Sequence, residues 1–278
     1  MMGKIMSQFV TLVAVMFVIF FCTSGMTGCN EMNPPVLVLT PPEHSESTTP
    51  EETATVPSAP QQETNAPTDP THETEMPTTP TETPPIQLTT APEGYFDDAL
   101  FIGDSRTVGL YEYGRIPGAT YFATTGMSVY SIFYDEVGNT SFQDLMDSRT
   151  FGKIYVMLGI NELGYDFEHT VTEYEELIEW IRQCQPDAII YIEANLHVSA
   201  DRSNSDRIYN NGNLDAFNER IAELADGVHI FYLDVNPLFD DGNGNLADKF
   251  TVDDTHVLGK YYRTWSDWIA ENAAVIPT

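Results

Sequence analysis

The second half of the chain alternates short apolar runs with amphipathic stretches. The apolar runs have the length of strands and lie at residues 99–102, 120–123, 153–158, 188–194 and 228–233. The clearest amphipathic stretch is 172–183, where apolar residues recur at helical spacing and Thr172 with Glu175 fits a capping box. Strands that alternate with helices imply parallel pairing through right-handed crossovers. We therefore predict an α/β fold, a three-layer α/β/α sandwich around a parallel sheet.

The N-terminal residues 1–28 have the features of an export signal. Lys4 precedes an apolar run at 9–22, which is short for a membrane span, and small residues follow it. The tetrapeptide Met26-Thr27-Gly28-Cys29 resembles the bacterial lipobox, so we predict cleavage before Cys29 and lipidation of that cysteine. An ordinary cleaved signal or an uncleaved anchor are the alternatives.

Residues 29–93 differ in composition from both flanking segments. Thr, Pro, Glu and Ser dominate, and no Lys or Arg occurs between Lys4 and Arg106. Such a segment buries too little apolar surface to offset the entropy of ordering it. We predict a disordered, extended linker that holds a domain at 94–278 away from the membrane. A glycosylated, mucin-like stalk is the alternative use of this composition.

Charge and cysteine content restrict the partners and the covalent framework. The formal net charge of −30 argues against nucleic acid and anionic lipid surfaces as partners. Of the three cysteines, Cys22 leaves with the signal and Cys29 carries lipid, so Cys184 remains without a disulfide partner. We expect Cys184 to be a half-buried packing residue.

Polar residues suited to acyl transfer follow several of the predicted strands. Ser105 lies in a Gly-Asp-Ser turn after the first strand, Gly126 follows the second and Asn161 follows the third. Asp253 and His256 precede the last helix, three residues apart. Singly, these are a helix cap, a turn glycine, a turn asparagine and a surface loop. Together they supply a nucleophile, a base, its orienting group and oxyanion donors at the ligand-binding edge of a parallel sheet.

In this order and spacing, the residues resemble the SGNH hydrolases of the GDSL esterase superfamily. The resemblance covers 94–278 and implies a flavodoxin-like sheet of five parallel strands and covalent catalysis without metal or cofactor. It makes Ser105 the nucleophile, His256 the general base and Asp253 the residue that orients His256. The backbone N–H groups of Ser105 and Gly126, with the Asn161 side chain, would form the oxyanion hole.

Two positions depart from the family pattern. Glu162 stands where members often have aspartate, and we expect its extra methylene to shift a supporting hydrogen bond. Asp254 stands where members often have glycine, so two carboxylates could reach His256. By motif spacing we assign Asp253 to His256 and expect Asp254 to point to solvent.

Further polar residues are candidates for the pocket, each with an equally plausible structural role. The substrate-binding candidates are Arg106, Glu162 and His197, with Tyr165 and Arg202 near the rim and Glu193 and Asn195 at the end of the fourth strand. The run Asp241-x-Asn243-x-Asn245 resembles the start of a calcium loop. It lacks the next glycine and a late acidic ligand, so we predict a tight turn and no metal.

From the residues and the resemblance we expect an exported, membrane-anchored, monomeric serine esterase. Its substrate would be a short acyl ester, such as acetyl, on a carbohydrate or cell-wall polymer. A lysophospholipase or thioesterase of the same fold, acyl transfer to another acceptor, and a non-catalytic glycan-binding module remain alternatives.

Overall fold

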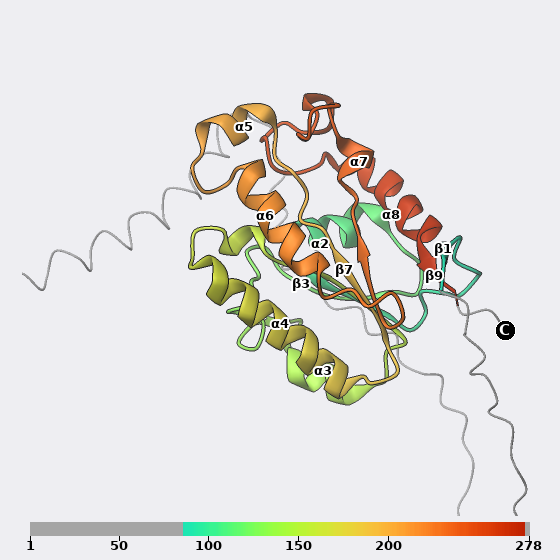
Figure 1. Ribbon diagram of the computed structural model, residues 1–278. Helices are drawn as coiled ribbons and strands as arrows, with labels where there is room; N and C mark the ends of the chain where they lie inside the picture. Colours follow the sequence, from blue (N-terminus) through green and yellow to red (C-terminus); the bar gives the residue numbers. More distant parts are fainter. Residues whose placement is uncertain (1–85, 276–278) are drawn as a thin grey trace, which may run out of the picture. The chain divides into compact units, whose positions relative to one another are not determined.

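The computed structural model describes residues 86–275 (Figure 1). The predicted signal peptide, Cys29 and most of the predicted linker lie outside these residues. Within 86–275, no helix combines the length and the apolar character needed to cross a membrane.

The central element is a five-stranded parallel sheet, which confirms the predicted fold class. Its strands are β2 (Ala99–Gly103), β3 (Thr120–Ala123), β6 (Lys153–Met157), β7 (Ile189–Glu193) and β8 (Ile230–Leu233). The spatial order is β3-β2-β6-β7-β8, and each neighbouring pair is parallel. The order reverses at β2, so the carboxyl ends of β2 and β6 flank the topological switch point where such sheets bind ligands.

Helices cover both faces of the sheet (Figure 1). Core residues of α3 (Phe142–Ser148), α4 (Phe167–Cys184) and α6 (Asn211–Ala222) pack with one face. Core residues of the π-helical turn η1 (Leu110–Gly114) and of α8 (Tyr262–Glu271) pack with the other, and the short α2 (Ser105–Gly109) leads from β2 into η1. The smaller elements are β1 (Leu88–Thr89), β4 (Glu136–Val137), β5 (Thr140–Ser141), η2 (Ile160–Glu162), α5 (Ala200–Ser205), α7 (Asn236–Phe239), η3 (Asp248–Phe250), η4 (Gly259–Tyr261) and β9 (Ala273–Ala274).

Residue alternation along the strands produces two separate cores. In β2, Leu100 and Ile102 belong to the core under α4, whereas Phe101 belongs to the core under α8. Phe101, Tyr155 and Tyr191 stack across three strands with ring centroids 4.3 Å apart in each pair. Buried on both faces, the strands appear in sequence as continuous apolar runs.

The start of α4 differs from the sequence prediction. We expected Thr172 and Glu175 to form a capping box, but α4 begins at Phe167 and its N-cap is Asp166. The Asp166 carboxylate accepts from the backbone N–H of His169 at 3.0 Å. The Thr172 hydroxyl instead donates to the carbonyl of Glu168, inside the helix.

The folded part of the chain also begins earlier than residue 94. Strand β1 pairs antiparallel with β9, and the N–H of Ala91 donates to the carbonyl of Ala270 at 2.7 Å. The end of the predicted linker therefore pairs with β9 and is part of the described domain. Cys184 is half-buried against the core that includes α4, as predicted.

Candidate active site

The turn after β2 places Ser105 at the carboxyl edge of the sheet. Gly103 ends the strand and Ser105 begins α2. A Cβ on Gly103 would collide with Thr107 Oγ1 and lie 2.6 Å from the carbonyl oxygen of Met157. Only glycine lets α2 approach β6 this closely, so Gly103 fixes the position of Ser105.

Asp104 is the fully buried N-cap of α2. Its Oδ1 accepts from the backbone N–H of Arg106 at 2.9 Å, and its Oδ2 lies 3.8 Å from Arg106 Nη1. Burial raises the pKa of Asp104, and the Arg106 charge partly opposes that rise. Asp104 thus holds the start of the helix that carries Ser105.

Ser105, His256 and Asp253 form a continuous chain of hydrogen bonds. Ser105 Oγ lies 2.8 Å from His256 Nε2, and His256 Nδ1 lies 2.8 Å from Asp253 Oδ2. Asp253 Oδ1 also accepts from the backbone N–H groups of Thr255 and His256, at 3.0 and 2.8 Å. The three-residue spacing lets one carboxylate hold both the backbone and the ring of His256.

The Asp253 carboxyl is tuned toward its charged form. Burial raises its pKa, but hydrogen bonds from the backbone and ring of His256 and from the backbone of Thr255 outweigh this and lower it. An ionised Asp253 favours a proton on His256 Nδ1, which leaves Nε2 as an acceptor toward Ser105.

Asp254 is exposed, as expected, but it is also hydrogen-bonded to Ser199. Its Oδ1 accepts from Ser199 Oγ at 2.9 Å, and its carbonyl accepts from the Ser199 N–H at 2.9 Å. Asp254 has a φ of 66°, in the left-handed region where glycine is preferred. The two bonds from Ser199 hold this strained residue, and with it the Asp253–His256 loop.

Arg106 lies inside the domain and does not reach the rim where we expected substrate contact. It is 1% exposed, and its Nη2 donates to the carbonyls of Leu196 and Thr255 at 3.3 and 3.5 Å. Arg106 therefore connects the Ser105 helix to the segment after β7 and to the residue before His256.

Two of the predicted oxyanion donors, Gly126 and Asn161, follow β3 and β6. Gly126 lies in the turn after β3 with a φ of 82° and open space around its α-carbon. Asn161 lies on η2, and its Nδ2 donates to the Met127 carbonyl at 2.9 Å and, over a long 3.4 Å, to Asp104 Oδ2. The Asn161 amide is thus held beside the Gly126 turn.

Glu162 supports this arrangement from inside the protein, which corrects our expectation of substrate contact. It is 1% exposed, and its Oε1 accepts from the Val129 N–H at 2.7 Å. Burial raises the pKa of Glu162 to about 7, and the Val129 bond partly opposes the rise. Through this contact Glu162 joins the Asn161 helix to the turn that carries Gly126.

The sequence of residues 101–264 matches the model of the GDSL-like lipase/acylhydrolase family, over more than half of the chain. The chain belongs to this family. Among curated proteins, none matches it.

Solved structures share the fold of this acylhydrolase. One is a Streptococcus pneumonia protein with the provisional description of a platelet activating factor (19% identity, TM-score 0.50, 62% of this chain, 81% of that chain). An acetyl xylan esterase (17%, TM-score 0.47, 62% and 98%) and a GDSL-like lipase from Bacteroides thetaiotaomicron (15%, TM-score 0.47, 64% and 88%) are similar at lower scores. At these identities the likeness shows the fold alone.

Other candidate residues of the acylhydrolase lie away from Ser105. His197 Nε2 is 2.8 Å from Asp215 Oδ1, in a separate pocket of about 210 Å³ that Asp234 also lines. Arg202 pairs with Asp206 on α5 at 3.2 Å. In the possible calcium loop, Asp241 Oδ1 accepts from the backbone of Asn243, as in the tight turn we expected.

Two residues hold the site together from outside it: Asn195, which we named as a pocket candidate, and Ser199, which sequence reasoning missed. Asn195 accepts from the Ile160 N–H through Oδ1 and donates to the Leu158 carbonyl through Nδ2, both at 2.9 Å. It thereby bridges the ends of β6 and β7. Ser199 is the second such residue, and the aspartate in place of glycine at Asp254 was the one sequence signal that could have indicated it.

Proposed function

We propose that this acylhydrolase is a serine esterase that cleaves carboxylic esters through an acyl-enzyme. The observation that carries the proposal is the hydrogen-bonded chain from Ser105 through His256 to Asp253, with 2.8 Å at each step. Nucleophile, base and orienting carboxylate are within bonding distance before any substrate binds.

In this mechanism, Ser105 Oγ attacks the ester carbonyl carbon while its proton passes to His256 Nε2. The tetrahedral intermediate collapses, and the departing alkoxide takes that proton to leave as an alcohol. Water then attacks the acyl-enzyme, again giving a proton to His256, which returns it to Ser105 as the carboxylic acid departs.

The oxyanion would be stabilised by donors at the start of α2, in the turn that holds Gly126 and on the short helix that holds Asn161. The first N–H groups of a helix lack partners within the helix, so the Ser105 N–H is available to a developing negative charge. The Gly126 N–H would donate from the turn after β3, and the Asn161 amide would donate the N–H that now makes the long 3.4 Å contact with Asp104 Oδ2. Loss of one such donor lowers turnover by about 10² to 10³.

For location and substrate, we propose a lipid-anchored enzyme outside the cytoplasm that removes short acyl groups from a carbohydrate or wall polymer. The support is the sequence alone: the predicted export signal at 1–28, directly before Cys29, and the predicted polar linker before the domain. Labelling cells that express the full chain with a radioactive fatty acid tests the anchor, with Cys29→Ser as the variant that should stay unlabelled.

The enzymatic proposal is tested by hydrolysis of chromogenic esters from acetyl to octanoyl. The full chain should be active, with acetyl or butyryl preferred, and Ser105→Ala should lose about 10⁴-fold in kcat/KM. Ser205→Ala, an exposed serine on α5, is the matched control. Equal activity in Ser105→Ala, or none on any ester, would favour a non-catalytic binding module, and a preference for octanoyl would favour a lipase.

A further inference from the structure

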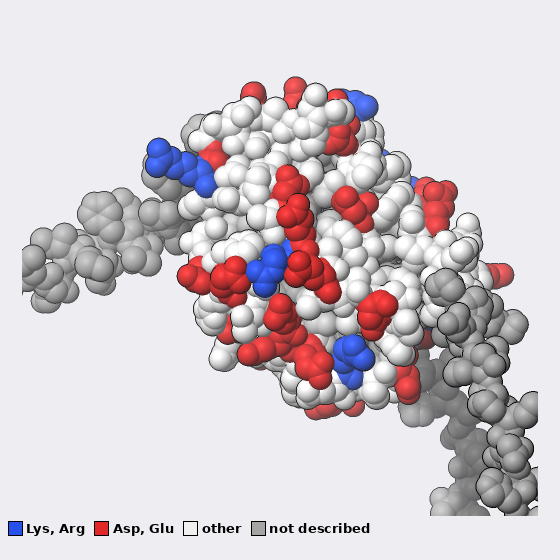
Figure 2. Space-filling view, in the orientation of Figure 1, with Lys and Arg blue, Asp and Glu red and all other residues white. Residues whose placement is uncertain are grey.

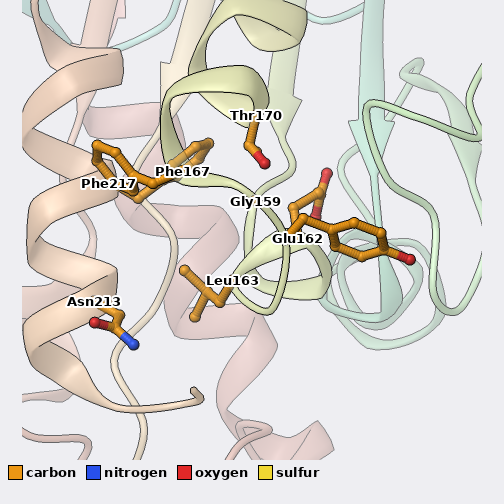
Figure 3. A pocket seen from close by; sticks show the side chains of 8 residues that line it. Gly159, Glu162, Leu163, Phe167, Thr170, Asn213 and Phe217 are labelled. Atoms are coloured by element: carbon orange, nitrogen blue, oxygen red, sulfur yellow. The ribbon is translucent and has the colours of Figure 1, made fainter. Parts of the chain in front are cut away.

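A pocket of about 110 Å³ lies beside the short helix that carries Asn161 (Figure 3). Gly159 and Glu162, which flank Asn161, form part of its wall, and Phe217 of α6 and Phe167 of α4 contribute apolar surface. The pocket is therefore built on the same three-residue turn as a proposed oxyanion donor. Neither Ser105 nor His256 lines the pocket, so a ligand seated there would leave the place of the reacting ester free.

Two exposed aromatic side chains, Tyr165 and Phe167, stand at the rim of this pocket. Tyr165 is 66% exposed and Phe167 is 38% exposed. Neither ring is loose: Tyr165 packs on Tyr130 with ring centroids 5.1 Å apart, and Phe167 meets Phe217 edge to face at 6.4 Å. Rigid, exposed aromatic rings beside a pocket are typical of surfaces that take up an apolar face of a ligand.

The pocket also presents fixed polar groups. Asn213 donates through Nδ2 to the carbonyls of Arg207 and Ile208, at 3.1 and 2.8 Å, which fixes the amide and leaves Oδ1 as an acceptor. Tyr165 brings a phenolic hydroxyl at the rim. The lining thus combines flat apolar surface with hydrogen-bonding groups.

The surrounding charge limits which ligands fit. Acidic side chains gather over α4 and α6, the two helices that contribute Phe167 and Phe217 to the pocket (Figure 2). Arg220, the nearby cation of α6, is already paired with Glu168 at 2.9 Å. Arg207, whose backbone carbonyl accepts from Asn213, adds an exposed positive charge, and the carboxylates outnumber it, so this surface disfavours phosphate-bearing or uronate polymers. Neutral hydroxylated rings carry no charge that this surface could repel, and their C–H faces pack against aromatic side chains.

We propose that this pocket is a subsite for a neutral sugar unit of the substrate, next to the unit that carries the ester. Tyr165 and Phe167 contact the face of the ring, and Asn213 accepts from a hydroxyl. The purpose of the subsite rests on the proposed esterase function, but sugar binding itself does not require hydrolysis. Because a cavity of about 150 Å³ can hold benzene, this pocket accepts part of one ring and leaves the rest over Tyr165.

The test is calorimetric titration of the full chain carrying Ser105→Ala with xylohexaose, cellohexaose and the hexamer of N-acetylglucosamine. At least one should bind with a Kd of about 1 mM or tighter. Adding Tyr165→Ala or Phe167→Ala should weaken that binding about tenfold, a loss of about 1.4 kcal/mol. Tyr134→Ala is the matched control, because Tyr134 is 88% exposed and lies outside the pocket lining.

Three results would overturn the subsite: no binding of any neutral hexamer, unchanged binding in both aromatic variants, or equally tight binding of hexagalacturonate. Ester hydrolysis by the wild-type chain separates the two proposals. Sugar binding without ester hydrolysis would contradict the esterase proposal and support the subsite. Ester hydrolysis without sugar binding would contradict the subsite proposal alone.

Discussion

At the scale of single residues, the candidate site depends on side chains that hold other side chains. Asp253 fixes both the backbone and the ring of His256, and Ser199 fixes Asp254 beside it. Arg106 connects this loop to the helix of Ser105. The geometry of Ser105 and His256 therefore depends on residues that have no role in bond breaking.

Asp254 offers a direct test of this support. Asp254→Gly should fold and retain kcat within about threefold, because glycine adopts the left-handed conformation without strain. Asp254→Val should lower kcat about tenfold or more, because a β-branched residue is strained there by roughly 1–2 kcal/mol, whereas both variants lose only the side-chain bond from Ser199 Oγ. Steady-state kinetics on an acetyl ester measure both, and equal kcat in the two variants would contradict the strained-loop account.

Glu193 makes stability depend on pH. Its carboxylate oxygens have no hydrogen-bond partner among residues 86–275, and burial raises its pKa from 4.5 to about 8. Because the folded chain holds the Glu193 proton more tightly than the unfolded chain does, protonation of Glu193 stabilises the fold. This part of the unfolding free energy is complete below about pH 4.5 and is lost as the pH rises to about 8. A tenfold difference in proton affinity between the folded and unfolded chain corresponds to about 1.4 kcal/mol.

Glu193→Gln should therefore remove a fall of a few kcal/mol in unfolding free energy between pH 5 and pH 8. Urea denaturation at several pH values measures it, with Glu219→Gln on the exposed face of α6 as the control. If Glu193→Gln and the wild type lose stability in parallel across this range, Glu193 does not carry the effect.

Individual side-chain roles were only partly predictable from sequence. Asp253 and His256 are three residues apart, so their contact follows from local chain geometry. Asn195 and Ser199 act on residues 35 to 55 positions away, and their spacing carries no signal for that. Arg106 is a charged residue just after a turn, a place where sequence predicts exposure, but the direction of α2 buries it.

At the scale of elements, the strands were predicted well because they are buried on both faces. Lys153–Met157 and Ile189–Glu193 match the predicted runs to within one residue at each end. The start of α4 was missed because its first turn holds Glu168 and His169, which interrupt the apolar stripe before Val171. The cap lies outside the periodic pattern that identified the helix.

The observed cap of α4 predicts an asymmetric pair of substitutions. Asp166→Ala should lower the free energy of unfolding by about 1 kcal/mol, because the His169 N–H loses its acceptor at the helix start. Thr172→Ala should change it by less than about 0.5 kcal/mol, since this position lies inside the helix. Chemical denaturation of both variants decides between the observed cap and the one predicted from sequence.

At the scale of the whole molecule, the described domain begins in what the composition marked as linker. β1 pairs with β9 at the opposite end of the chain, and a two-residue strand is too short to be detected from sequence. A fragment that starts at residue 94 should therefore melt several degrees below one that starts at residue 86. Calorimetry of the two fragments tests this, and identical melting temperatures would show that β1 adds nothing.

The central claim is that His256 and Asp253 make Ser105 a nucleophile. The most direct measurement is the intact mass of the full chain after reaction with a fluorophosphonate, followed by peptide mapping. We expect one covalent adduct, on Ser105, that is absent in Ser105→Ala and forms far more slowly in His256→Ala. An unlabelled wild-type chain, or an adduct on another residue, would contradict it.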